Sequence, residues 1–473
     1  MKKNLILFIA LFSFADAFCQ KESNHWCFGQ YNTINFDNCT PIASTETSLY
    51  SIEGASCISD KTTGELLFYT NGVTVWDRND SPMPNGSGLS GNQSNTQVLI
   101  TPMPGSSNKF YIFTTDLQGN SGPGLRYSIV DMTLNSGFGD VLTKNYLLHN
   151  PIVCEKLTAT WHSNGTDIWV VAHEFGNNNF LSFQISSVGV SATPIISSIG
   201  FNHIGGYDSR GELKFSPNGN KLSNATNGDG SGICANELFD FNTTTGVVSN
   251  CISLPNENWG YGTCFSLDNS KLYFTTSPVF ATSTTYSKLY QFDLSSGVPS
   301  TIITSKCIID SVNVFTENSY QSCYLGLDGK IYVALYGANY IGMINSPDVA
   351  GTSCNFVKNG LYLNGQQCLS GTNNLISVTD TCSLTSVDDN FLSQNELLVY
   401  PNPFTTTVTI NFSNFRFLPK SVFLYDLCGN KIMDFEITQP ILQINRGNMK
   451  KGIYILQVPS GDRNNINYKI VIE

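Results

Sequence analysis

One stretch of the sequence reads Gly64-Glu65-Leu66-Leu67-Phe68-Tyr69-Thr70-Asn71-Gly72-Val73-Thr74-Val75-Trp76, two short apolar runs separated by Asn-Gly. Asn and Gly both tolerate a positive φ, so Asn-Gly between two apolar runs is the strongest short-range signal for a β-hairpin. We therefore predict two antiparallel strands that turn at Asn71-Gly72.

Related units recur along the middle of the chain, at a period of roughly 50 residues that falls in the range of β-propeller blades. After the first hairpin, units begin at Asn108, Gly165, Phe215, Phe265 and Leu325. Further hairpin turns are predicted at Asn218-Gly219 and Asp328-Gly329. A single blade cannot bury both of its faces, whereas radial packing against neighbours can. Residues 25–382 are therefore predicted to form a β-propeller.

The number of blades stays open between six and seven. Six units are internal to the repeat region. A seventh would combine strands at 355–357 and 360–363 with the N-terminal stretch Trp26-Cys27-Phe28-Gly29. That combination would close the ring with strands from both ends.

Composition supports an all-β chain of more than one domain. The chain has 473 residues, only 13% of them charged, with 40 glycines and 12% aromatic residues. This suits short strands and polar turns better than helices. The formal net charge of −11 argues against nucleic acid or an anionic membrane as a partner. Fourteen cysteines permit disulfides in an exported chain, although free buried thiols are an equal alternative.

The N-terminus has the pattern of a secretory signal peptide, predicted at residues 1–19. Lys2-Lys3 precede an apolar run from Leu5 to Phe14, and small residues follow at Ala15 and Ala17. Cleavage is expected after Ala17 or after Cys19. The apolar run is too short to span a membrane.

The last residues, 397–473, predict a small β-sandwich after a polar linker at 383–396. Alternating apolar runs at 407–412, 421–425 and 453–458 indicate strands with one buried face, separated by turn residues.

Four motifs occur in order in this segment: Tyr400-Pro401-Asn402-Pro403, Leu424-Tyr425-Asp426-Leu427-Cys428-Gly429, Gly452-Ile453-Tyr454-Ile455-Leu456 and Lys469-Ile470-Val471. The segment resembles the A-type C-terminal sorting domain of the type IX secretion system of Bacteroidota. The resemblance implies export across the outer membrane by the type IX secretion machinery, removal of the domain, and a secreted or cell-surface protein. The sorting-signal residues that it implies are Tyr400, Pro401, Asn402, Pro403, Gly429, Gly452, Tyr454 and Lys469. The middle of the chain is similar to uncharacterised propeller-type repeats in large secreted Bacteroidota proteins.

Catalytic candidates are few. Only five histidines occur, at positions 25, 149, 162, 173 and 203. His162, His173 and Glu174 flank one predicted hairpin, and Glu155-Lys156 lies just before it. A general acid/base or metal cluster is one interpretation of this group, and hydrogen bonds that fix strand ends are the other. Because no metal-spacing or nucleophile motif accompanies these residues, we predict no catalytic residue, no metal site and no cofactor.

Two further features are interpreted as structural. The stretch Asn227-Gly228-Asp229-Gly230-Ser231-Gly232 lacks the ordered acidic spacing of a calcium loop, so we expect a blade loop. The tryptophans that could form sugar-stacking platforms are expected in the core between blades, because they sit in or beside alternating strands. They are Trp76, Trp161, Trp169 and Trp259.

The sequence therefore predicts a secreted or surface-displayed propeller that binds an unknown extracellular ligand, a glycan or a protein, through loops at one face. The alternative is a secreted propeller enzyme, a polysaccharide lyase or hydrolase that uses a His/Glu cluster. Grouped His and Glu side chains at the channel mouth would favour the enzyme, and an aromatic or Asn-rich face would favour the binding protein.

Overall fold

The computed structural model describes residues 21–37, 39–94, 96–115, 124–205, 207–228, 236–255, 259–278, 285–376, 398–412, 419–427, 429–458 and 466–473. The chain divides into two compact units, Met1–Ser383 and Leu384–Glu473. The predicted signal peptide (1–19) and linker (383–396) lie outside the described residues.

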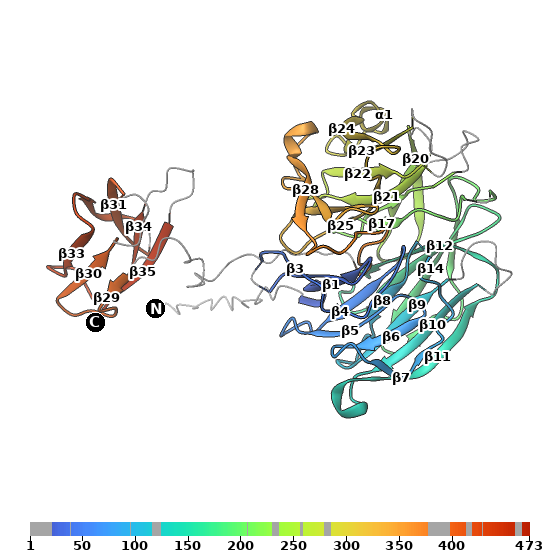
Figure 1. Cartoon of the computed structure of the whole chain (residues 1–473), viewed down its shortest axis with the longest axis horizontal. Coiled ribbons are helices and arrows are strands. Elements are labelled where there is room, and N and C mark those ends of the chain that lie inside the picture. The colour runs from blue at the N-terminus through green and yellow to red at the C-terminus, as the bar shows by residue number, and fades with distance from the viewer. Residues whose placement is uncertain are drawn as a thin grey trace, which may run out of the picture. The chain divides into compact units, whose positions relative to one another are not determined.

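Seven antiparallel sheets follow one another along the described part of the first unit (Figure 1). The first has three strands, β1 (His25–Phe28), β2 (Asn32–Asn35) and β3 (Ile42–Ser44). The next two have four each: β4 (Ser56–Ser59), β5 (Leu66–Thr70), β6 (Thr74–Asp77) and β7 (Pro82–Ser87), then β8 (Leu99–Pro102), β9 (Lys109–Thr114), β10 (Leu125–Asp131) and β11 (Asp140–His149). The fourth has β12 (Val153–Trp161), β13 (Ile168–Glu174), β14 (Asn179–Ser186), β15 (Gly189–Val190) and β16 (Ile195–Ser198).

Three more four-stranded sheets complete the unit. They are β17 (Leu213–Phe215), β18 (Lys221–Asn224), β19 (Asn236–Phe241) and β20 (Val248–Leu254); β21 (Gly260–Phe265), β22 (Lys271–Thr276), β23 (Tyr286–Asp293) and β24 (Cys307–Asn313); and β25 (Tyr320–Leu325), β26 (Ile331–Leu335), β27 (Tyr340–Ile344) and β28 (Phe356–Tyr362). The described helices are short: η1 (Lys21–Ser23), η2 (Asn135–Gly137), α1 (Pro299–Thr304) and η3 (Gly351–Cys354).

Within a sheet, burial falls from the first strand to the last. Every residue of β21 and of β25 is buried, whereas most residues of β24 and β28 are half-buried or exposed. The first strand of each sheet also contacts the first strand of the next sheet. The first strands are therefore innermost, and the sheets radiate from them in the propeller-like arrangement that the repeats predict.

The last sheet meets the first at an aromatic seam. The ring of Trp26 in β1 lies edge-on to the rings of Tyr324 and Tyr332, at 5.2 and 5.1 Å between centroids. Beside this contact, the side-chain amide of Asn32 donates to the carbonyl of Gln367 at 2.8 Å. The two ends of the unit thus close on each other, as the neighbouring blue and orange sheets of Figure 1 show.

The three predicted hairpin turns are confirmed. Gly72 lies between β5 and β6, Gly219 between β17 and β18, and Gly329 between β25 and β26, with φ of 83°, 72° and 75°. At the first turn, the side-chain oxygen of Asn71 accepts from the backbone N–H groups of Val73 and Thr74, both at 3.1 Å. Asn caps the turn while Gly supplies the left-handed backbone.

The proposed blade shared between the two ends is wrong. β28 pairs with β27 and is the outer strand of the last sheet, and β1 pairs with β2 in a sheet of its own. The reason is local: β2 and β3 follow β1 closely enough to provide its hydrogen-bonding partners, so β1 needs no strand from the other end.

Residues 370–376, which come after β28, lie among the innermost strands, and we name this segment the plug. Asn374 is 3% exposed, and its side-chain nitrogen donates to the carbonyls of Val98 at 3.0 Å and Leu157 at 3.1 Å. Its side-chain oxygen accepts from the ammonium of Lys214 at 3.0 Å. One amide thus joins residues at or beside three innermost strands, β8, β12 and β17.

Backbone contacts attach the plug to a fourth innermost strand, β4. Asn374 N–H donates to Ala55 at 3.1 Å, and Asn373 forms a parallel bridge with Ala55. A Cβ on Gly371 would lie 1.2 Å from the carbonyl oxygen of Glu53, so only glycine fits at that approach.

The second unit contains two sheets. One has β29 (Leu398–Tyr400), β30 (Thr407–Asn411) and β33 (Ile441–Asn445), and the other has β32 (Lys431–Glu436), β31 (Ser421–Asp426), β34 (Gly452–Val458) and β35 (Ile466–Ile472). Val408 and Ile410 of the first sheet share one buried apolar cluster with Val422, Leu424 and Leu456 of the second. The alternating runs seen in the sequence therefore place one face of each sheet in a common core.

Most described cysteines are free thiols. The buried ones are Cys27, Cys57, Cys154, Cys264, Cys323, Cys354 and Cys368, with Cys307 half-buried and Cys251 exposed. Cys39 is disulfide-bonded. The alternative of free buried thiols therefore describes seven of these nine positions.

Replacing Asn374 by Ala tests the plug. The substitution leaves the buried carbonyls of Val98 and Leu157 and the Lys214 ammonium without this partner, and each such group costs about 1–3 kcal/mol. We expect the free energy of unfolding in urea to fall by about 2–4 kcal/mol. The control is Asn318→Ala, which removes one exposed hydrogen bond to Tyr336 and should change stability by less than about 1 kcal/mol. Equal effects of the two substitutions would contradict the assigned role of the plug.

Candidate functional site

The three residues singled out in the sequence do not converge. His162 lies in the turn after β12, where its Nε2 donates to the carbonyl of Thr244 at 3.1 Å and its ring stacks on Trp169. His173 and Glu174 lie at the far end of β13. Glu174 binds Nε2 of His149, a histidine outside this group, at 2.9 Å. The predicted local hydrogen bonds are therefore present.

Buried charges gather where the innermost strands begin, and we name Glu155, Lys156, Glu212 and Lys214 the axial cluster. All four side chains are 6% exposed or less. Glu155 accepts from the backbone N–H of Thr96 at 3.0 Å. The sequence singled out Glu155 and Lys156 but not the second pair, 55 residues or more further along the chain, because no local spacing links the two.

The charges of the axial cluster are matched by protein partners. Glu212 accepts from Thr263 N–H at 3.0 Å and lies 3.8 Å from the ammonium of Lys214. Lys156 donates to the carbonyls of Arg210, Gly211 and Ala225. Burial lowers the pKa of Lys156 to about 8. A buried charge is costly unless it has such partners. Because the partners lie in neighbouring sheets, the axial cluster links those sheets.

Glu53 stands at the side of the axial cluster. Its carboxylate accepts from the hydroxyl of Thr96, which also contacts Glu155. Burial, and next the negative charge of Glu155, raise the pKa of Glu53 to about 7, although Arg210 opposes the shift. A carboxyl group that titrates near neutral pH is suited to exchange protons with a ligand.

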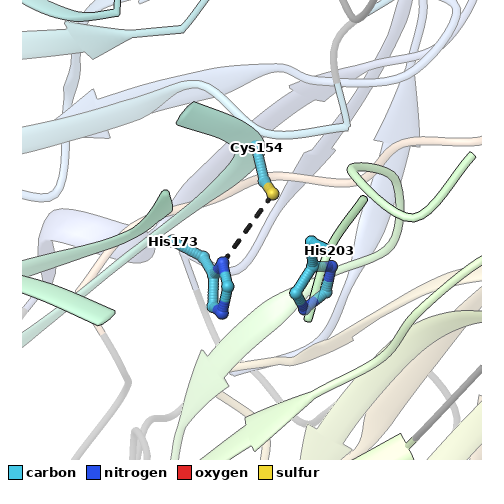
Figure 2. A group of neighbouring side chains, drawn as sticks. All are labelled: Cys154, His173 and His203. Atoms are coloured by element: carbon cyan, nitrogen blue, oxygen red, sulfur yellow. Dashed lines mark hydrogen bonds between the residues drawn. The ribbon is translucent and has the colours of Figure 1, made fainter. Parts of the chain in front are cut away.

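A second group of side chains meets between the fourth and fifth sheets, and Figure 2 shows it. Cys154 of β12, His173 of β13 and His203 before β17 are all buried. Their candidate ligand atoms lie within 4.8 Å of one another, and the two imidazole centroids are 4.1 Å apart. Sequence spacing gives no sign of this group, because 49 residues separate its first and last members.

An open groove of about 450 Å³ lies along the second sheet. Its lining residues are all uncharged: Ser48, Tyr50, Asn71, Val73, Thr74, Trp76, Asn92 and Gln93. Tyr50 is 37% exposed and pairs with the exposed ring of Tyr31 at 6.2 Å between centroids. Two exposed aromatic rings therefore stand beside several amide groups.

The tryptophans that were predicted to lie in the core differ in their burial. Trp169 is 3% exposed and packs in a core cluster, as predicted, whereas Trp161 lines a second cavity of about 340 Å³ together with Asp60 and Lys61. Trp259 is half-buried. Residues 229–232 of the Asn227–Gly232 stretch lie outside the described residues.

In the second unit, the first of the four ordered motifs docks on the last. The side chain of Asn402 donates to the carbonyl of Lys469 and accepts from Val471 N–H, both at 2.8 Å. Phe404 forms a parallel bridge with Ile472. The Tyr-Pro-Asn-Pro motif is thus held by the final strand, and the ring of Tyr400 is 49% exposed.

The other sorting-signal residues have structural surroundings. Gly429, with φ of 81°, lies between β31 and β32, and Gly452, with φ of 153°, begins β34. The hydroxyl of Tyr454 donates to the carbonyl of Lys450 at 3.0 Å. Cys428 lies outside the described residues.

Residues 398–473 match the secretion system C-terminal sorting domain family. The resemblance to a type IX sorting domain is confirmed, and the chain is a type IX sorting-domain protein with a propeller-like all-β unit before it. The domain indicates secretion to the cell surface or beyond it. Among the described residues, no helix has the length and apolar character needed to cross a membrane.

Similarity to individual proteins is limited. An endo-acting ulvan lyase from Formosa agariphila is 30% identical over 89 residues, which make up 19% of this chain and 17% of the lyase. PorZ, a surface component of the type IX secretion system of Porphyromonas gingivalis, is 11% identical, with 94% of this chain and 68% of PorZ covered at a TM-score of 0.36. The periplasmic gluconolactonase PpgL of Pseudomonas aeruginosa is 12% identical, with 80% and 97% covered and a TM-score of 0.37. These structural likenesses carry no argument about activity.

The raised pKa of Glu53 predicts a pH dependence of stability. The pKa is about 7 in the folded chain against an ordinary value of 4.5, so the folded state binds the proton more tightly between these pH values. Stability therefore falls as pH rises from about 4.5 to about 7. Glu53→Gln removes the ionisation, so its free energy of unfolding should decline less than that of the wild type over this range. The exposed Glu65→Gln control should follow the wild type. Parallel curves for all three proteins would show that Glu53 is not shifted.

Proposed function

We propose that this chain is a secreted or cell-surface binding protein, a seven-bladed propeller whose sorting domain is a small β-sandwich that engages the type IX secretion machinery. The uncharged groove lined by Tyr50, Trp76, Asn71, Asn92 and Gln93 carries the proposal. In this interpretation the sheet β1–β3 is the seventh blade, and the plug belongs to the scaffold.

The chemistry of the groove favours a neutral glycan. Aromatic rings present apolar faces that stack on the C–H faces of sugar rings, and amide groups satisfy sugar hydroxyls as both donors and acceptors. No lining residue carries a charge that would select an ionic ligand. The net charge of −11 repels polyanions at longer range.

Binding of a neutral glycan is measured by screening the purified chain on neutral oligosaccharides, followed by titration calorimetry on those that bind. Tyr50→Ala and Asn92→Ala should each weaken binding by roughly tenfold, because each removes one stacking or hydrogen-bonding partner. Tyr286→Ala is the matched control, since Tyr286 is 49% exposed on β23, outside the groove. Affinity that is unchanged in both groove variants, or absence of any glycan ligand, would refute the proposal.

Export is tested with a chain that stops at residue 397. The propeller unit has its own cores, so it should still fold, but without residues 398–473 it should accumulate in the periplasm. Cell fractionation and protease accessibility measure the distribution, with the full-length chain as the control. Normal surface delivery of the shortened chain would remove the sorting role from this domain.

A lyase or hydrolase is the second candidate, and Glu53 beside Glu155 favours it. A carboxyl group with a pKa near neutrality is suited to general acid/base work on a polysaccharide. Release of reducing ends or unsaturated sugars from a polysaccharide, abolished by Glu53→Gln but not by Tyr286→Ala, would select this function over simple binding.

A further inference from the structure

We propose that Cys154, His173 and His203 form a binding site for one thiophilic metal ion, Zn²⁺ or Cu⁺. One thiol and two imidazoles form the donor set that these ions prefer, whereas Ca²⁺ and Mg²⁺ require oxygen ligands. The sequence predicted no metal site, because its histidines are few and no metal-spacing motif accompanies His162, His173 and Glu174.

The hydrogen bonds of the two imidazoles prepare them for a metal. Nδ1 of His173 lies 2.7 Å from the carbonyl oxygen of Glu174, and Nδ1 of His203 lies 2.6 Å from that of Asp208. A carbonyl oxygen only accepts, so both Nδ1 atoms carry the proton and both Nε2 atoms carry the lone pair. Metal-bound histidines usually make this second contact, which fixes the ring and its tautomer.

The lone pair on Nε2 of His173 has no other partner among the described residues. The side chain of His173 is fully buried. A buried polar atom without a partner costs about 1–3 kcal/mol. A metal ion at this position supplies the missing partner, and Cys154 supplies the thiolate that an ion of this class prefers. The lone pair of His203 Nε2 accepts from the side-chain amide of Asn224 at 3.3 Å, and that amide also donates to Glu237. A metal ion would replace Asn224 at His203.

The distances suit a metal after small adjustments. Zn–S bonds of about 2.3 Å and Zn–N bonds of about 2.0–2.1 Å place the ligand atoms of a tetrahedral site about 3.4–3.6 Å apart. The three residues have candidate ligand atoms within 4.8 Å of one another, and the two imidazole centroids are 4.1 Å apart. Side-chain rotations that move each atom by about 1 Å are enough to complete the site.

The surrounding charges accommodate a cation. The positive charge of Lys156 lies close enough to interact electrostatically with both histidines. Three backbone carbonyls accept hydrogen bonds from its ammonium group. Three carboxylates, those of Glu155, Asp208 and Glu237, attract the Lys156 charge electrostatically and so offset it. An ion bound here would join the segment before β17 to the sheet of β12 and β13, and so fasten two neighbouring sheets.

Metal titration of the full-length chain tests the site. After removal of metals with a chelator under reducing conditions, the chain is titrated with Zn²⁺ or Cu⁺ against a chromophoric competitor selective for each ion. We expect about one equivalent to bind, and Cys154→Ser or His203→Asn to weaken binding by about 100-fold or more. The matched controls, Cys264→Ser in β21 and His162→Asn, should bind as the wild type does. The ion that the chain binds more tightly in these two competition titrations is assigned to the site.

A second measurement on the wild type does not depend on how well the variants fold. Co²⁺ bound at this site should give a thiolate-to-cobalt charge-transfer band, and Zn²⁺ should displace it and raise the melting temperature. Failure of the wild type to bind either ion, a cobalt spectrum without the thiolate band, or unchanged binding in folded Cys154→Ser would each overturn the proposal.

Discussion

The structure depends on a single buried amide, that of Asn374. A ring of radiating sheets has polar backbone groups facing its axis, and each buried group must find a hydrogen-bonding partner because an unpartnered one is costly. Asn374 provides partners for Val98, Leu157 and Lys214, and the backbone of the plug pairs beside β4. The segment that ends the propeller unit therefore also joins four of its innermost strands.

In this arrangement, the residues that hold the sheets together are different from those that we propose to bind a ligand. The axis is occupied by the plug and by charges with protein partners, so the axial cluster serves to hold sheets in place. At the surface, the groove beside Tyr50 and Trp76 offers aromatic and amide groups without charge, and this is where we propose that a ligand binds. In the second unit, Asn402 and Phe404 are tied to the last strand, while the ring of Tyr400 is 49% exposed.

Features written in local sequence were predictable, and features that depend on distant residues were not. Asn71-Gly72 specifies its turn through φ and side-chain capping, and alternating apolar residues specify the strands, so the repeated sheets and the strands of the second unit followed directly. The sorting domain was identified through the resemblance of its four ordered motifs to a known family. The plug has no periodicity that marks it as buried. The Cys154, His173 and His203 group and the approach of Glu53 and Glu155 to the same Thr96 hydroxyl arise only when separate sheets meet, which spacing cannot reveal. The prediction of a closing blade shared by the two ends was wrong, because an alternating pattern identifies a strand but not the strand with which it pairs.

Hydrogen exchange of the plug amides, followed by mass spectrometry on the folded full-length chain, tests the central role of the plug most directly. If Asn374 holds the innermost strands together, its N–H to Ala55 opens only when the whole unit unfolds. The peptide covering residues 370–376 should then exchange as slowly as the peptides of β12 and β21. Exchange at the rate of exposed loops would show that the ring stands without the plug and would contradict this account.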